Sequence, residues 1–383
     1  MEYFLTETQK EIRDLARRFA EEKMKPVRAE LDKTGEFPHA LMKELGELGL
    51  MGVYIPEEYG GLGGGIMEMC IVVEELCRID GAAGLCYAGC GLGTYPIILS
   101  GTEEQKKKYL PRLAAGELGA FAVTEAMAGS DASNVKTQAK KDGDHYVLNG
   151  TKQFITNGSV AKIYSVIAAT NPAKGARGLS AFIIEDGMPG FTYGKLEDKM
   201  GIRCSKTSEL VFEDCRVPAG NLIGGKEGYG FINTMKTFDR TRPGVGAQAL
   251  GIAQGALDEA LEYAKTRIQF DQPISSFQAV QIMLADMAIA VEASRALIYE
   301  AARAIDAGLK SAAGIASIAK VMASDTAMKV TTDAVQILGG YGYMKEYPVE
   351  KMMRDAKITQ IYEGTNQIQR LVIASELIKG TIW

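Results

Sequence analysis

The sequence predicts an α+β fold in three parts: an N-terminal helical domain over residues 1–119, a small antiparallel β-domain over residues 120–228, and a C-terminal four-helix-bundle-type domain over residues 229–383. Apolar residues recur at helical spacing up to about residue 120, the period changes to two as far as about residue 225, and the helical period then returns. With 383 residues, the chain is long enough to bury the cores of several domains.

Helical spacing of apolar residues defines the N-terminal domain. Ile12, Leu15 and Phe19 fall on one face of a predicted helix, and a glycine-rich segment at residues 51–65 is too broken to continue the pattern. Further helices are predicted over Ile66–Ile79, around Tyr87–Leu99 and over Glu103–Ala115.

A period of two marks the β-domain. The run His145–Thr156 is predicted to form two strands around a type I′ turn at Asn149-Gly150, a strong hairpin signal. Other predicted strands are Tyr164–Ala169, Leu179–Ile184 and Ser208–Phe212. After residue 230, frequent Ala and Met indicate close packing of helices, with one apolar stripe at Val280, Leu284, Met287 and Val291.

Composition and charge argue against several function classes. A net charge of −5 and a pI near 5.4 disfavour nucleic-acid binding. The six cysteines include no C-x-x-C pair and are expected in the core. The two histidines, His39 and His145, are expected at the surface. Zinc chemistry and a Ser-His-Asp site are therefore disfavoured. Neither a secretory signal nor an apolar stretch of about 18 residues is evident, so a cytoplasmic protein without membrane insertion is expected. Catalysis would require a carboxylate and a bound cofactor.

The most distinctive residue is Glu363, in the run Ile361-Tyr-Glu-Gly-Thr-Asn-Gln367. Gly364 permits backbone conformations that other residues resist, so the turn can direct the carboxylate inward. A carboxylate held away from water and without a positive partner is a stronger base, with a pKa tuned toward about 6–7. Taken alone, the residue is better explained as a solvated loop glutamate, and only the rest of the sequence reverses this interpretation.

No G-x-G-x-x-G, Walker A or metal-ligand run is present, so a dinucleotide would have to bind outside a Rossmann unit. In the segment Phe121–Asp131, Gly129 and Ser130 can offer backbone N–H groups and a hydroxyl to a pyrophosphate. The run Gln336–Tyr343 ends a predicted helix in a glycine-rich turn, which is also explained as an ordinary helix C-cap.

Taken together, these segments resemble the acyl-CoA dehydrogenase family, of the short-, medium- or branched-chain type, over essentially the whole chain. The matching runs are Val123-Thr-Glu…Ala128-Gly-Ser-Asp131, Thr151–Gly158, Phe238–Arg242, Arg267–Phe270, Gln336–Gly340 and Arg354–Lys357 with Ile361–Gln367. Each run is weak alone, whereas the set in this order on an α–β–α layout is specific.

The resemblance implies an FAD enzyme that oxidises an acyl-CoA thioester to its 2-enoyl form, an oxidoreductase acting on a CH–CH bond. Glu363 matches the base that removes the alpha proton while a beta hydride passes to flavin N5. Some relatives carry the base on the helix that matches Phe238–Arg242. The corresponding residue here is Thr241, which cannot act as a carboxylate base, and this strengthens the assignment to Glu363.

The resemblance also implies flavin contacts. Residues matched to the isoalloxazine ring and pyrophosphate are Val123, Thr124, Ser130, Phe154 and Thr156, with Thr365 and Gln367 nearby. A neighbouring subunit of a homotetramer, built as a dimer of dimers, is expected to complete the adenine half through Arg267, Phe270, Gln336, Gly339 and Gly340. Three positions depart from the family pattern: Phe154 replaces a frequent Trp, Ala126 a common Pro, and Asp271 a common Gly.

Substrate contacts are implied less sharply. Candidates are Ala88, Gly91, Tyr95, Ser130, Ser205, Asp239, Thr241, Arg242, Tyr362 and Gly364. The small residues from Gly84 to Gly91 either make room for a wide acyl group or serve close helix packing. Glutaryl-specific relatives carry Arg where Gly84 stands, so a dicarboxylic acyl group is disfavoured. The expected substrate is a short, branched or alicyclic acyl-CoA.

Electron-transferring flavoprotein is the expected electron acceptor. An acyl-CoA oxidase, which passes electrons to oxygen, is one alternative. A catalytically inactive flavin-binding assembly protein is another, disfavoured because the Glu363 run is intact. Oxidation of a non-CoA substrate such as a nitroalkane would favour a base at a different position.

Overall fold

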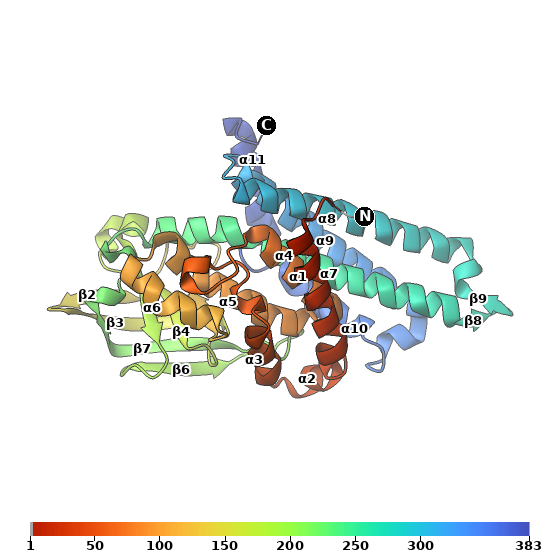
Figure 1. Cartoon of the computed structure of the whole chain (residues 1–383), viewed down its shortest axis with the longest axis horizontal. Helices are drawn as coiled ribbons and strands as arrows, with labels where there is room; N and C mark the ends of the chain where they lie inside the picture. Colours follow the sequence, from red (N-terminus) through yellow and green to blue (C-terminus); the bar gives the residue numbers. More distant parts are fainter. Residues whose placement is uncertain (1–2, 383) are drawn as a thin grey trace.

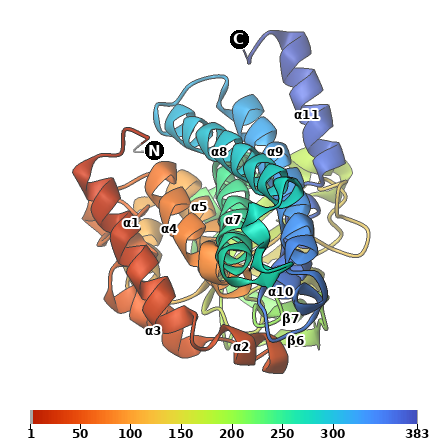
Figure 2. The ribbon, with the colours of Figure 1, turned by 90° about the vertical axis from the view of Figure 1, so that its right-hand side faces the viewer.

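The structure is a computed structural model that describes residues 3–382. The predicted order of helical domain, β-domain and helical domain is confirmed. In Figure 1 the β-domain lies at one end of the molecule, and the long C-terminal helices extend from it to a small β-hairpin at the other end. The N-terminal helices pack along one side of this body (Figure 2).

The N-terminal domain comprises α1 (Glu7–Phe19), α2 (Arg28–Thr34), α3 (His39–Glu47), α4 (Ile66–Ile79), α5 (Gly81–Ser100) and α6 (Glu103–Ala114). α1 begins with a capping box: the Thr6 side chain accepts a hydrogen bond from the Gln9 N–H, and the Gln9 side chain accepts one from the Thr6 N–H. Its inner face presents Ile12, Ala16 and Phe19 to the core.

α5 is the central helix of this domain. It begins earlier than predicted because Asp80 caps it, its Oδ1 accepting the N–H of Ala82 at 2.8 Å and that of Ala83 at 3.3 Å. By length and composition α5 could cross a membrane, so the expectation that no apolar stretch reaches this length was wrong. Its most apolar window is 78% buried inside the protein, as in a core helix.

The β-domain comprises β1 (Gly119–Ala122), β2 (Gln138–Asp142), β3 (His145–Thr156), β4 (Ile163–Ala169), β5 (Leu179–Glu185), β6 (Phe191–Leu196) and β7 (Thr207–Pro218). They form one sheet in the order β1-β4-β2-β3-β7-β6, and β5 pairs with β4. The pairing is antiparallel except that β4 runs parallel to β1 and, at a single residue pair, to β2.

The predicted hairpin turn at Asn149-Gly150 was wrong. β3 continues through these residues and pairs with β7 on both sides of them. The hairpin instead joins β2 to β3, where Asp142 pairs with His145 and Gly143 adopts a φ of 59° in the two-residue turn. Gly150, at φ 147°, passes close to β2: a Cβ there would lie 2.6 Å from the Thr137 hydroxyl oxygen.

The C-terminal domain comprises α7 (Gly230–Thr266), β8 (Ile268–Gln269), β9 (Gln272–Pro273), α8 (Gln278–Asp306), α9 (Ala312–Leu338), α10 (Val349–Lys357) and α11 (Asn366–Lys379). Helices α7, α8 and α9 lie side by side in both views (Figures 1 and 2). In the predicted stripe, Met287 and Val291 are buried, whereas Val280 and Leu284 are only partly buried. α11 projects from the bundle and carries exposed Leu371 and Ile378.

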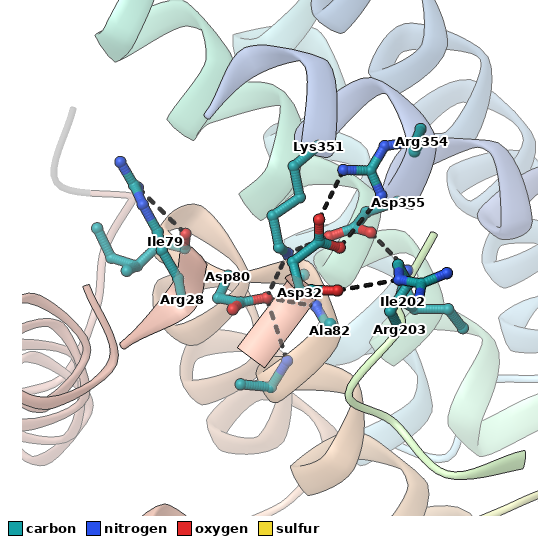
Figure 3. A network of polar contacts seen from close by, with 12 residues as sticks. Arg28, Asp32, Ile79, Asp80, Ala82, Ile202, Arg203, Lys351, Arg354 and Asp355 are labelled. Atoms are coloured by element: carbon teal, nitrogen blue, oxygen red, sulfur yellow. Dashed lines mark hydrogen bonds and ion pairs between the residues drawn. The ribbon is translucent and has the colours of Figure 1, made fainter. Parts of the chain in front are cut away.

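A buried ion-pair network links the N-terminal and C-terminal domains (Figure 3). Lys351 of α10 donates to Asp80 Oδ1 at 2.8 Å and to Asp355 Oδ2 at 2.6 Å. The three side chains are 8%, 1% and 1% exposed, respectively. The cap of α5 is thereby attached to α10.

The same network reaches the β-domain. Asp355 Oδ1 accepts the N–H of Ile202 at 2.5 Å, which holds the loop between β6 and β7 against α10. Ile202 has a φ of 46°, a conformation rare for a β-branched residue, so this hydrogen bond helps to keep an unfavourable backbone in place. Arg354 forms a paired contact with the Asp32 carboxylate at 3.1 and 2.8 Å, joining α2 to the same region.

Candidate active site

A cavity of about 890 Å³ lies where the three domains meet. Its walls come from α4 and α5, from the β-domain segments 121–133, 154–156 and 197–207, from α7 and α10, and from residues 361–372. Met69, Val73 and Gln248 line its closed end and are at most 2% exposed. Met200 and Phe154, at 60% and 59% exposure, lie on its open side.

Many of the predicted site residues meet in this cavity. The predicted base and flavin contacts that line it are Glu363, Val123, Thr124, Ser130, Phe154, Thr156 and Thr365. The predicted substrate contacts that line it are Ala88, Ser130, Thr241, Arg242, Tyr362 and Gly364. Residues far apart in the sequence therefore surround one space.

Other predicted residues lie outside the cavity wall. Gly91 faces Met69 and Tyr54, and Tyr95 stacks on Tyr54 at 5.4 Å between ring centroids. Ser205, Asp239 and Gln367 do not line the cavity either. Ser205 is fully buried, Asp239 forms an ion pair with Arg242 at 2.6 Å, and Gln367 is exposed on α11. Direct substrate contact is thus better supported for Ala88 than for Gly91 or Tyr95.

A separate group of predicted residues lies at the opposite end of the long helices, near the β8–β9 hairpin (Figure 1). Arg267 lines a smaller cavity of about 380 Å³ with Tyr341, whose ring centroid is 5.3 Å from the guanidinium. Phe270 is 86% exposed, and Gln336, Gly339 and Gly340 are also exposed. None of them touches the main cavity of its own chain.

The carboxylate of Glu363 is controlled by its surroundings. Burial raises its pKa, and a 2.7 Å hydrogen bond from the Thr241 hydroxyl to Oε2 acts in the opposite direction. The positive charges of Arg242 and Lys320 also lower the pKa of this carboxyl. Burial is the largest of these effects, and the net shift is upward.

The turn that carries Glu363 is held from behind. Glu363 and Gly364 adopt φ values of 50° and 90°, and such values are uncommon for a residue other than glycine. The ammonium of Lys320 donates to the Gly364 carbonyl at 3.0 Å and to Asn366 Oδ1 at 2.9 Å. The Gln369 side chain donates to the Glu363 carbonyl at 3.1 Å. These contacts fix the two peptide groups that follow Glu363, on either side of Gly364.

Lys320 was not predicted from the sequence. It is fully buried on α9, and burial lowers its pKa to about 8. Its neighbours on the inner face of α9 include Ala316, Ala319 and Ala323, all buried, and a lysine within such a stripe was the available signal. Its hydrogen-bond partners, Gly364 and Asn366, follow α10 in the sequence, so the spacing of residues along α9 could not identify these contacts.

Tyr362 links the turn to the helices opposite. Its hydroxyl donates to the Gln248 side chain, and the amide of Gln248 donates to the Gly81 carbonyl at 3.2 Å. The turn that carries Glu363, α7 and α5 are therefore joined by one chain of hydrogen bonds.

A buried pair supports the β-domain wall of the cavity. Lys152 donates to Glu125 Oε1 at 2.7 Å and to the Val123 carbonyl at 3.0 Å, and Glu125 also accepts the N–H groups of Lys136 and Thr137. Burial lowers the pKa of Lys152 to about 8 despite its negative partner. Both residues lie inside the quoted sequence runs, but their pairing emerged only from the structure.

This wall suits a flat, polar-edged ring system. Thr124, Ser130 and Thr156 are hydroxyl-bearing residues in its lining, and Phe154 adds an aromatic side chain that is 59% exposed. Phe154 has a φ of 57° and lies at a register shift between β3 and β7, which explains why this side chain leaves the regular alternation of the strand. A Cβ on Gly129 would meet nothing within 4 Å, so the loop is open to a ligand. The residues present fit a flavin.

Comparison with known proteins identifies the family. The descriptions "Acyl-CoA dehydrogenase, N-terminal domain", "middle domain" and "C-terminal domain" match residues 6–117, 120–215 and 228–378. A chain from a solved structure of the electron transferring flavoprotein of Acidaminococcus fermentans is 51% identical, with a TM-score of 0.97 over 99% of this chain and 100% of that one.

Two further proteins are similar over nearly their whole length. Butyryl-CoA dehydrogenase from Megasphaera elsdenii is 50% identical, with a TM-score of 0.96 over 99% of this chain and 100% of that one. Acryloyl-CoA reductase (NADH) of Anaerotignum propionicum is 50% identical over 382 residues, which cover 99% of this chain and 96% of that protein. The chain therefore belongs to the acyl-CoA dehydrogenase family of oxidoreductases.

Proposed function

We propose that this protein converts a short-chain acyl-CoA thioester to the 2-enoyl-CoA, with FAD as cofactor and Glu363 as the base. The observation that carries this proposal is the Glu363 carboxylate, which lies in a cavity closed by apolar residues and whose pKa is raised by burial. A base of raised pKa is suited to a weakly acidic proton alpha to a thioester.

The arrangement assigns a role to each part of the turn. Thr241 holds Glu363 Oε2, so Oε1 is assigned to take the alpha proton. The backbone N–H of Glu363 is assigned to the thioester oxygen, where negative charge develops. Gln369 and Lys320 hold the two peptide groups that follow this N–H. Anchoring in advance means that little reorganisation is needed during the reaction.

FAD is proposed to bind against Val123, Thr124, Ser130, Phe154 and Thr156. When bound, it supplies the acceptor for the beta hydride at its N5 atom. The Lys152–Glu125 pair supports this wall through the Val123 carbonyl.

A neighbouring subunit is proposed to complete the cofactor site. Arg267 and Phe270 lie away from the main cavity of their own chain. Phe270 is 86% exposed and Arg267 is half-buried, so both remain accessible to another subunit. Exposed apolar side chains on α8 and α11, namely Ile282, Ile289, Leu371 and Ile378, provide a surface for such association. A homotetramer is the proposed assembly.

The proposed acyl group is short. Gly84 is explained by packing, because a Cβ there would lie 2.3 Å from Cys77 Sγ. A Cβ on Gly91 would make ordinary contact with Met69 and Tyr54, away from the cavity lining. Only Ala88 and Gly89 of this small-residue segment line the cavity, which weakens the case for a wide alicyclic group. The similarity to butyryl-CoA dehydrogenase points to a four-carbon chain.

Two features of the reaction depend on its partner. Electron-transferring flavoprotein is the proposed electron acceptor, supported by the similarity to a chain from a structure of that flavoprotein. The similarity to acryloyl-CoA reductase favours a second candidate, in which the same residues act in the reverse, reducing direction. An oxidase would be recognised by peroxide accumulating in air.

The test is anaerobic reduction of the purified flavoprotein by butyryl-CoA, isobutyryl-CoA and cyclohexanecarboxyl-CoA, followed by loss of flavin absorbance. Butyryl-CoA is expected to bleach the flavin fastest. Glu363→Gln should retain FAD and the fold but slow reduction by about 10²–10⁴-fold, the usual contribution of a general base. Near-normal reduction in Glu363→Gln would refute the base assignment. Absence of bleaching by all three compounds in wild-type protein that contains FAD would refute the substrate class.

A further inference from the structure

The side chain of Met69 occupies a gap between two helices at the closed end of the main cavity. A Cβ on Gly244 of α7 would lie 3.0 Å from Met69 Cε, and a Cβ on Gly91 of α5 would lie 3.4 Å from Met69 Sδ. Gly244 therefore leaves room for the tip of Met69, whereas a Cβ on Gly91 would make ordinary contact with it. The side chain lines the cavity and is 2% exposed.

Behind Met69 lies an aromatic pair. The rings of Tyr54 and Tyr95 stack at 5.4 Å, and Tyr54 Cζ lies 3.6 Å from the position of a Gly91 Cβ. Both tyrosines are buried, yet neither lines the cavity, whereas Met69 does. Met69 is thus the layer that separates the cavity from this pair.

We propose that Met69 is a specificity-determining residue that ends the acyl site and sets the longest straight acyl chain the enzyme accepts. This inference rests on the proposed function. Methionine is unbranched and flexible, so it fills an irregular gap without fixing its shape rigidly. Leu85 and Val73 also line the cavity, and their apolar side chains, together with Met69, favour hydrocarbon. Removing the methionine tip would extend the cavity toward Tyr54 and Tyr95.

The first test compares Met69→Ala with Met67→Ala. Met67 is a matched control because it lies on the same helix, is 3% exposed and does not line the cavity. Flavin reduction by butyryl-CoA and hexanoyl-CoA is measured anaerobically under single-turnover conditions. The hexanoyl-to-butyryl ratio of specificity constants should rise about fifteenfold in Met69→Ala, since each buried methylene contributes about fourfold. The ratio should not change in Met67→Ala.

The second test moves the methionine in the opposite direction. Gly244 itself lines the cavity, so the methyl of Gly244→Ala would narrow the cavity beside Met69 as well as press on Met69 Cε, and the hexanoyl-to-butyryl ratio should fall several-fold. Gly246→Ala is the control, because its Cβ would instead meet Ile298 at 3.2 Å, away from the cavity. This pair retains the test if Met69→Ala does not fold.

The outcomes are distinguishable. Unchanged ratios in folded, FAD-containing Met69→Ala and Gly244→Ala would overturn the inference while leaving the proposed function intact. An equal change in the control variants would also overturn it, because the effect would then be general loosening of the core. Failure of every acyl-CoA to reduce the wild-type flavin would instead refute the proposed function and, with it, this inference.

Discussion

Replacing Lys351 by Met should destabilise the protein strongly, because it leaves two carboxylates buried without their cation. Asp80 and Asp355 are each 1% exposed and lie 2.8 and 2.6 Å from the Lys351 ammonium. Breaking a buried ion pair by removing one partner typically costs about 3–5 kcal/mol. Backbone N–H groups of Ala82 and Ile202 still reach the two carboxylates, so the lower end, about 3 kcal/mol, is expected.

The assay is chemical and thermal unfolding of the FAD-loaded protein at neutral pH, with hydrogen exchange of residues 198–202 as a local readout. That segment should exchange faster because Asp355 holds it through the Ile202 N–H. Lys43→Met is the matched control: its partner Glu47 is 3.6 Å away, and the two side chains are 79% and 63% exposed. Its cost should be below about 1 kcal/mol. A loss below about 1 kcal/mol in Lys351→Met, comparable with the control, would refute the reasoning.

Three further changes probe the site. Thr241→Val removes the hydrogen bond that lowers the Glu363 pKa, so this pKa should rise. Flavin reduction needs the ionised carboxylate, so on lowering the pH its rate should begin to fall at a higher pH than in the wild type. Superimposable pH–rate profiles would contradict this. Lys320→Met should retain FAD but slow flavin reduction by about 10²-fold, because the Gly364 peptide would be misplaced. Lys320→Arg should restore part of the rate. An unchanged rate in Lys320→Met would show that Lys320 does not position the turn. Arg267→Ala should weaken FAD retention in gel filtration, whereas a stable FAD-loaded tetramer would show that this residue does not serve the cofactor.

Features of the fold that depend on local pattern were predictable from the sequence. The helix predicted at Ile66–Ile79 coincides with α4, because capping and apolar spacing agree there. The Asn149-Gly150 signal failed because pairing with β7, a strand distant in the sequence, overrides the local turn preference. β2 was missed because four of its five residues are exposed and three are charged, so it shows little apolar alternation.

The site shows the same division. The sequence run around Glu363 singled out this residue as the candidate base, and Thr241, identified from a distant run, lies in hydrogen-bond contact with it. The support provided by Lys320 could not be predicted, because it depends on how α9 packs behind the turn. The orientation of Gly91 away from the cavity likewise depends on the rotation of α5, which is almost uniformly apolar and gives no periodic cue.

Because the main cavity lies between the three domains, a ligand bound in it should stabilise the folded protein. A molecule held there contacts all three domains at once, so its binding free energy opposes their separation. At a ligand concentration of 100 times the dissociation constant, this linkage amounts to about 2.7 kcal/mol. A chain that fails to acquire its ligands would separate its domains more often, exposing apolar surface to proteases and chaperones. Cofactor supply would thus govern how long each molecule survives as well as how fast it turns over.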